Sequence, residues 1–381
     1  MSLFANVSGA GLLALAALTL TGAAAPAAAA EPVTIGSIEA LSGPASRYGL
    51  AIRAGLELAL DEINAAGGVL GGRPLQILFE DSAGQKEQAI NAARKLIGRD
   101  KVSAIIGPTL STEMFAVGPV ANERQVPIIG TSNTANGITD IGPFVFRTSM
   151  PEADVIPVTL KTAQSRFGVK RVAVMYGNDD AFTKSGYDVF KAALTTLGIE
   201  TVTTETFGAK DADFSAQLTK IKSLDVDAVV VSALVEAASG ILLQARQVGI
   251  PDRVFFIGGN GFNSPKFGEI AGTTADGTLV GSPWFIGKAD PANHAFVAAF
   301  TRRTGAPPDQ FAAQAYDTLF ILAEAINRAG ATGGEAIRDA LTRTSHTGVL
   351  GPFTFDAHRS PGATTGVVVL ISRGGKFEAL Q

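Results

Sequence analysis

The sequence predicts an α/β protein made of two doubly wound, Rossmann-like parallel-sheet lobes that are joined by a three-strand hinge. Three observations support this prediction. The chain has 381 residues, of which 46% are hydrophobic and 17% charged, so it is long and apolar enough for two cores. Strand and helix patterns alternate with little interruption after residue 31. The same alternation begins again near residue 172.

In the first α/β unit, the clearest element is a helix expected over residues 47–66. Its apolar side chains Ile52, Leu56 and Ile63 fall on one face, and Gly67 provides a C-terminal stop. We expect the other elements of this unit to be strands over 33–38, 75–79, 102–106 and 127–129 and helices over 85–97 and 111–122. Repeated strand–helix–strand units imply a parallel sheet with helices on both faces.

The second unit repeats this pattern. We expect strands over 172–176, 201–207, 228–232 and 254–257 and helices over 183–197, 214–223 and 235–248. A second parallel sheet covered by helices follows from the same reasoning.

The remaining chain is helical over 291–304 and 308–329 and then β-rich over 352–355 and 365–371. If the late helices rejoin the first unit, the chain crosses between the lobes near Ser149, near Ser282 and near Asp356. The sequence therefore predicts an N-terminal lobe and a C-terminal lobe that are each discontinuous in sequence. Their bounds are 31–148 with 284–355 and 149–283 with 356–381.

The N-terminal residues 1–30 have the pattern of a secretory signal peptide. An apolar core over 12–20 is followed by Ala28-Ala29-Ala30, which is typical of a cleavage site. The segment before this core carries no Lys or Arg, which departs from the pattern, and an N-terminal membrane anchor is the alternative. We expect export to the periplasm and no membrane-embedded segment after processing.

Composition excludes several classes of function. The chain has no Cys, which rules out disulfides, thiolate metal sites and lipid attachment at a processed Cys. A net charge of −4 and the lack of basic runs argue against a nucleic-acid partner. His294, His346 and His358 lack metal-ligand spacing, and neither glycine-rich segment, 67–72 or 258–261, completes a phosphate-binding fingerprint. We therefore expect no catalytic residue, metal or cofactor.

Two strand ends carry the functional signal. Ile106 to Glu113 and Pro127 to Thr134 each run from an apolar strand into a turn of small, hydroxyl-bearing residues. The first turn leads into a helix, whose free N–H groups favour an anion. Because open α/β sheets bind ligands at the carboxyl ends of their strands, this pattern predicts a carboxylate-binding cleft. Ser111 alone fits a helix N-cap equally well.

Several motifs resemble those of the periplasmic branched-chain amino-acid binding proteins that serve ABC transporters. These motifs follow one another in the order of that family and extend over nearly the whole chain after residue 30. They are Leu41-Ser42-Gly43-Pro44, Tyr48-Gly49, Asp61 to Gly68, Asp81, Ile106-Gly107-Pro108 and Phe146-Arg147-Thr148. The resemblance implies the type I periplasmic binding protein fold.

The resemblance also implies a ligand site shared by both lobes. The family's ligand positions fall here on Tyr48, Thr109, Ser111, Ser132, Thr134, Phe182, Leu234 and Asn260. In such proteins, hydroxyl and backbone N–H groups of the first lobe hold the ligand carboxylate. Asn260 stands where amino-acid binders place an acidic partner for the α-ammonium, and a buried ammonium without such a partner is costly. An organic acid without an ammonium therefore fits these residues at least as well as an amino acid, although the Asn260 carbonyl is able to accept from an ammonium or an amide.

The function that the resemblance implies is the periplasmic solute-binding component of an ABC importer. Such a protein closes around a small carboxylate by hinge motion and delivers it to a membrane permease, without chemistry. Two alternatives stay open at the level of sequence. One is the ligand-binding module of a sensory receptor system, and the other is an exported α/β enzyme, for which the sequence supplies no catalytic pair.

Overall fold

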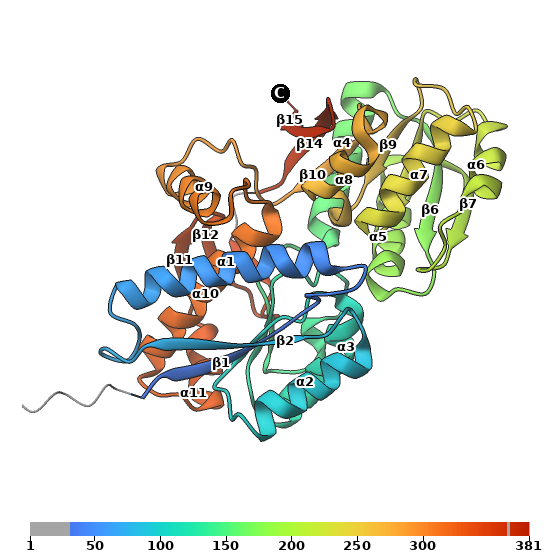
Figure 1. The fold of residues 1–381 in the computed structure, drawn as a ribbon. Helices are drawn as coiled ribbons and strands as arrows, with labels where there is room; N and C mark the ends of the chain where they lie inside the picture. The colour runs from blue at the N-terminus through green and yellow to red at the C-terminus, as the bar shows by residue number, and fades with distance from the viewer. Residues whose placement is uncertain (1–30, 364–365, 381) are drawn as a thin grey trace, which may run out of the picture.

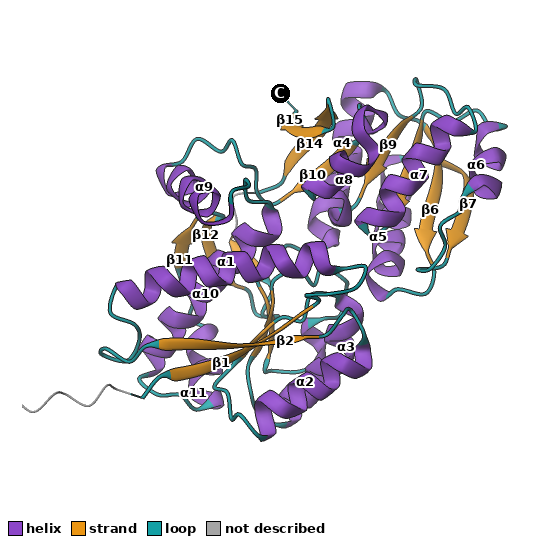
Figure 2. Ribbon diagram, in the orientation of Figure 1, coloured by secondary structure: helices purple, strands orange, loops and turns teal. Residues whose placement is uncertain are grey.

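The computed structural model describes residues 31–363 and 366–380, and the predicted signal peptide lies outside them. The chain forms two α/β lobes that lie side by side (Figure 1). The N-terminal lobe contains the blue-to-cyan segments and late helices in orange, and the C-terminal lobe contains the green-to-yellow segments and the last strands in red. Each lobe has a central sheet with helices on both faces (Figure 2). The two-lobe architecture agrees with the sequence prediction.

A parallel sheet of five strands in the order β2-β1-β3-β4-β5 forms the core of the first lobe. Its strands are β1 (Val33–Glu39), β2 (Leu75–Asp81), β3 (Ile105–Ile106), β4 (Ile128–Gly130) and β5 (Val145–Arg147). Its helices are α1 (Ser46–Ala65), α2 (Lys86–Gly98), α3 (Ser111–Glu123), α9 (Pro291–Thr304), α10 (Gln310–Ala329) and α11 (Gly334–Leu341). Apolar residues of α1 and α10 cover one face of the sheet, and those of α2 and α3 cover the other.

Helices α1 and α10 lie in direct contact although more than two hundred residues separate them in sequence (Figure 1). Gly55 of α1 permits this close approach, because a Cβ there would lie 2.2 Å from the carbonyl oxygen of Ala312. The Tyr316 hydroxyl of α10 donates to Glu62 of α1 at 2.6 Å. Helix α10 therefore packs against the first helix of the N-terminal lobe.

The second lobe contains a seven-stranded sheet in the order β15-β14-β10-β9-β8-β6-β7. The pairs among β7, β6, β8, β9 and β10 are parallel, and β14 and β15 add antiparallel edges. The strands are β6 (Arg171–Gly177), β7 (Glu200–Phe207), β8 (Ala228–Ser232), β9 (Phe255–Gly258), β10 (Leu279–Ser282), β14 (Val368–Arg373) and β15 (Lys376–Ala379). The helices are α4 (Glu152–Phe167), α5 (Ala181–Leu197), α6 (Ser215–Lys222), α7 (Val235–Gln247) and α8 (Pro265–Ala271).

The chain crosses between the lobes after β5, after β10 and after a small antiparallel sheet near the C-terminus. That sheet consists of β11 (His346–Gly348), β12 (Gly351–Phe355) and β13 (Pro361–Ala363). Because β13 pairs with β12, the third crossing falls between β13 and β14, later than the predicted site near Asp356. The Asp356 carboxylate accepts from the backbone of His358 and Ser360 and closes the turn that delays the crossing.

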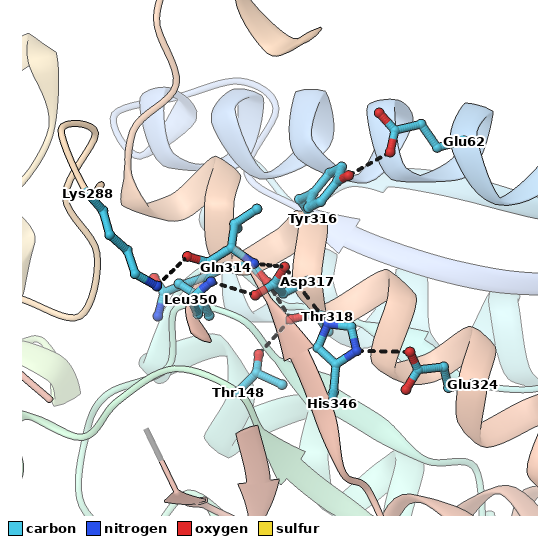
Figure 3. Close-up of polar contacts among 11 residues, drawn as sticks. Glu62, Thr148, Lys288, Gln314, Tyr316, Asp317, Thr318, Glu324, His346 and Leu350 are labelled. Carbon is cyan, nitrogen blue, oxygen red and sulfur yellow. Dashed lines mark hydrogen bonds and ion pairs between the residues drawn. The ribbon is translucent and has the colours of Figure 1, made fainter. Parts of the chain in front are cut away.

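A polar cluster ties these late segments to α10 (Figure 3). Asp317 accepts from the backbone N–H of Val349 at 3.0 Å and of Leu350 at 2.8 Å. Thr148, at the start of the first crossing, shares a 2.6 Å hydrogen bond with Thr318. The first crossing and the small sheet are therefore fastened to the same helix.

Candidate functional site

A cavity lies between the two lobes, at the carboxyl ends of their strands. All eight residues predicted from the sequence line it, together with Leu110, Gly261 and Phe311. The structure therefore brings the predicted positions into one place. No Lys or Arg is among the lining residues, so the described wall would hold an anion by N–H and hydroxyl groups.

Ser111 opens α3, directly after the turn that follows β3. The cap position belongs to Leu110, whose backbone N–H donates to Glu113 at 3.0 Å, so the Ser111 hydroxyl does not cap the helix. That hydroxyl accepts a long contact of 3.4 Å from the Ala135 backbone and keeps its proton for another partner. The first N–H groups of a helix also lack intrahelical partners, so this end of α3 favours a carboxylate.

The turn after β4 supplies Ser132 and Thr134. The Ser132 hydroxyl donates to the Thr109 carbonyl at 2.6 Å, and its lone pairs are left to accept. Thr134 is buried, and its hydroxyl has no hydrogen-bond partner. A buried polar group without a partner costs about 1–3 kcal/mol, which a ligand bound at Thr134 would relieve.

Thr109 lines the cavity with its hydroxyl already bonded. It donates to the buried Glu39 carboxyl at 2.5 Å and accepts from the Ala40 backbone at 3.0 Å. Burial raises the pKa of Glu39 to about 8, against the opposing hydrogen bonds from Thr109 and Ser37. Thr109 therefore positions the turn, and its hydroxyl is not available to a ligand in this arrangement.

Tyr48 of α1 spans the cavity to the second lobe. Its hydroxyl donates to the Gly261 carbonyl at 2.7 Å and accepts from the Val235 N–H at 2.8 Å. Burial raises the pKa of Tyr48 well above its usual value, so the phenol stays neutral. The lobes also meet where Thr112 donates to Asp180 at 2.6 Å. The structure is thus a closed arrangement of the two lobes.

Phe311 is a lining residue that the sequence reasoning missed. It is the second residue of α10, and its ring meets the Tyr48 ring edge-on at 4.8 Å between centroids. In sequence it is one apolar residue among many on an amphipathic helix, so no local signal distinguishes it.

The second lobe supplies Phe182, Leu234 and Asn260. Phe182 is in the first turn of α5, which Asp180 caps by accepting from the Thr183 N–H at 2.9 Å, and Leu234 is the N-cap of α7. Gly261 lies close to Phe182 and Ala233, because a Cβ there would be 3.2 Å from the Phe182 ring and 2.4 Å from the Ala233 carbonyl oxygen. This wall is apolar except for Asn260, in the short 3₁₀ turn (Asn260–Phe262) after β9.

Asn260 is held by two neighbours. Its backbone N–H donates to the buried Glu152 at 2.9 Å, and its side-chain oxygen accepts from Gln310 at 2.9 Å. Burial raises the pKa of Glu152 to about 7, opposed by the hydrogen bond from Asn260. Glu152 does not line the cavity, and no carboxylate is among the lining residues.

In the described ranges, no group of three or more His, Asp or Glu side chains is arranged to hold a metal ion. No helix there combines the length and the apolar character that a membrane crossing requires.

The sequence matches the periplasmic binding protein family over residues 32–376. A Leu/Ile/Val-binding protein, BraC3, of Rhizobium johnstonii is 33% identical over 86% of this chain and 87% of its own length. A leucine-, isoleucine-, valine-, threonine- and alanine-binding protein of Pseudomonas aeruginosa is 29% identical over 90% of each chain.

Solved structures give the same result. The branched-chain amino-acid transporter substrate-binding protein LivJ of Streptococcus pneumoniae, solved with isoleucine, superposes with a TM-score of 0.85 at 30% identity. The match covers 92% of this chain and 98% of that protein. These relatives are solute-binding proteins and not enzymes, so the family resemblance and the expected type I fold are confirmed.

Proposed function

The chain belongs to the periplasmic binding protein family, and on that basis we propose that it is the periplasmic substrate-binding component of an ABC importer. It captures a small carboxylate, either an amino acid or an organic acid, in the cavity between its lobes. Its partner is the membrane permease that receives the ligand.

One observation carries this proposal: Thr134, whose buried hydroxyl has no partner, lines the same cavity as Ser111 at the start of α3. Hydroxyl donors and a helix N-terminus together suit a carboxylate, because each places N–H or O–H groups toward negative charge. The apolar side chains of Phe182, Leu234 and Phe311 would enclose a short aliphatic or aromatic body.

Closure follows from the contacts across the cavity. Because Tyr48, Thr112 and Asp180 bond across the lobes, a ligand that touches both walls adds its own contacts to the closed form alone. Such differential binding shifts the equilibrium between open and closed lobes toward the closed one.

Thermal-shift screening tests the proposal. The purified protein is compared with a panel of aliphatic and aromatic acids, their α-amino counterparts and the neutral amides of the same skeletons. A ligand that binds the native state raises the melting temperature, so we expect a rise with at least one carboxylate and none with its amide.

The matched variant is Ser111→Ala, which removes the hydroxyl without removing a helix cap. We expect it to weaken the response to the carboxylate and to leave the unliganded melting temperature nearly unchanged. A panel in which only uncharged compounds bind, or a Ser111→Ala protein with full affinity, contradicts the carboxylate site.

A further inference from the structure

A buried chain of side-chain hydrogen bonds leads from the second crossing to the cavity. It joins Trp284, Ser282 of β10, Asn263, Gln310 of α10 and finally Asn260. Each of these residues is at most 9% exposed, so water has little access to their polar atoms. This series of hydrogen bonds therefore fixes which atom each amide side chain presents to its neighbour.

The carbonyl oxygen of Trp284 sets the donor and acceptor roles along this series of hydrogen bonds, because a carbonyl oxygen only accepts. The Ser282 hydroxyl donates to that carbonyl, and the Trp284 N–H donates back to Ser282 Oγ at 3.2 Å. Ser282 Oγ must then accept from its next neighbour, so Asn263 presents its Nδ2 at 2.6 Å.

The same Nδ2 of Asn263 donates to Gln310 Oε1 at 2.7 Å. Ser282 Oγ lies 3.0 Å from that oxygen, but its single proton is directed to the Trp284 carbonyl. Gln310 is left with its Nε2 toward Asn260, where it donates to Oδ1 at 2.9 Å. This bond uses one lone pair of the Asn260 oxygen and fixes which way the amide is turned, so Nδ2 is the side-chain donor left for a ligand in the cavity that Asn260 lines.

We propose that Gln310 is a positioning residue that fixes Asn260 as a hydrogen-bond donor, so that the site prefers a carboxylate bearing a neutral acceptor over one bearing an α-ammonium. The acceptor is a 2-oxo, hydroxyl or ether oxygen near the carboxylate. This inference rests on the proposed function and narrows its substrate class.

The chemistry of the two groups explains the preference. An ammonium carries three donors and no acceptor, so it cannot bond to the Asn260 Nδ2, and it loses its hydration on entering the cavity. Glu152, the carboxyl next to Asn260, is directed to the Asn260 backbone and does not line the cavity. A carbonyl oxygen in the same place accepts from Nδ2.

The test compares 4-methyl-2-oxopentanoate with L-leucine, which share a carbon skeleton and differ only in the oxo and ammonium groups. We expect calorimetry with the unmodified protein to find the oxo acid bound at least about tenfold more tightly, equivalent to one well-placed hydrogen bond. Equal affinity, or tighter binding of leucine, overturns the inference. If neither these two nor any other carboxylate binds, the proposed function itself fails.

Two variants test whether the orientation of the Asn260 amide causes the preference for the oxo acid. Asn260→Asp places a carboxylate oxygen in the cavity and should shrink the oxo-acid preference about tenfold or reverse it. Gln310→Met frees the Asn260 amide to turn and should shrink the same ratio. Gln314→Met is the matched control, because Gln314 is equally buried on α10 and its amide has no hydrogen-bond partner.

A ratio that falls in Gln310→Met and stays unchanged in Gln314→Met supports the positioning role. A ratio that both variants leave unchanged, or that both lower equally, contradicts it. Glu152→Gln tests the remaining alternative. If it selectively abolishes leucine binding, Glu152 is an ammonium partner and the inference is wrong.

Discussion

The two walls of the cavity differ in how their polar groups are satisfied. In the first lobe, the Thr134 hydroxyl has no partner and the Ser111 hydroxyl has only a long contact. In the second lobe, Asn260 is bonded through both its backbone N–H and its side-chain oxygen. The hydroxyl groups of the first wall therefore gain their hydrogen-bond partners only when a ligand binds. The polar group of the second wall is already held in one orientation, which suits it to select among ligands.

The strongest test of this contrast removes the Thr134 hydroxyl. In Thr134→Val, a carboxylate loses a charge-assisted hydrogen bond, which is worth about 1.5–3 kcal/mol, or roughly tenfold to a hundredfold in affinity. Calorimetry with the tightest-binding acid measures the loss. Thr131→Val is the control, because Thr131 is also buried with an unpartnered hydroxyl but does not line the cavity. Equal losses in both variants would mean that the first wall does not depend on the ligand.

Loss of the Tyr48 hydrogen bonds between the two walls should cause the next largest loss of affinity. Tyr48→Phe leaves the Val235 N–H and the Gly261 carbonyl without their partner in the closed form, at a cost of about 1–2 kcal/mol or roughly five- to thirtyfold in affinity. Small-angle scattering should show that a saturating ligand lowers the radius of gyration of the unmodified protein, and that Tyr48→Phe needs more ligand for the same change. Tyr187→Phe, whose ring stacks on Tyr176 within the second lobe, should behave as the unmodified protein. A radius that does not respond to ligand argues against hinge closure.

Both lobes also bury carboxyl groups beside the site, among them Glu39 behind Thr109 and Glu152 behind Asn260. Burial raises the pKa of Glu39 to about 8, from an ordinary value of 4.5. The folded state therefore binds more protons than the unfolded state between these values, and the free energy of unfolding should fall as pH rises from about 5 to 8. Urea unfolding should show that Glu39→Gln removes part of this decline, on the order of 1–2 kcal/mol.

Glu152→Gln is the matching change in the second lobe. Because the pKa of the Glu152 carboxyl is raised to about 7, its share of the fall in unfolding free energy should end near pH 7 and not near pH 8. An unfolding free energy that is flat over this range in the unmodified protein would show that neither carboxyl is perturbed.

The smallest expected loss of affinity concerns the contact between Thr112 and Asp180, which we call the rim of the cleft. Thr112 donates to Asp180 and accepts from the Ala181 N–H at 2.9 Å, at a partly exposed contact between the lobes. Thr112→Val should cost about 1 kcal/mol of closure, or roughly fivefold in affinity, because water partly replaces both bonds. Thr162→Val is a suitable control, since its hydroxyl bonds only within α4. A larger loss than that of Tyr48→Phe would place the main link at the rim.

Much of this arrangement could be predicted from the sequence. Strand and helix periodicity located most of both sheets, and turns at strand ends converge because parallel strands share one edge. That geometry is why eight positions scattered from Tyr48 to Asn260 line one cavity. Helix α4 was missed because Pro157 interrupts its pattern, and α8 because it has only seven residues.

What could not be predicted depends on pairs of residues far apart in sequence. The Thr109 hydroxyl is bonded to Glu39, seventy positions away, and no local pattern reports such a pair. The Gln310 amide decides the orientation of Asn260 across fifty positions. The third crossing came later than expected because a side chain, Asp356, closes a turn that the β-rich pattern does not reveal.

The pairing of α1 with α10 has a consequence for how this chain acquires its structure. The apolar face of α1 packs on a helix that begins at Gln310, so a chain growing from its N-terminus cannot finish its first lobe until most of the second has been made. The second lobe in turn lacks β14 and β15 until the end of the chain. Neither lobe is a self-sufficient N-terminal fragment. We expect the protein to assemble late and slowly, because its decisive contacts join distant parts of the chain.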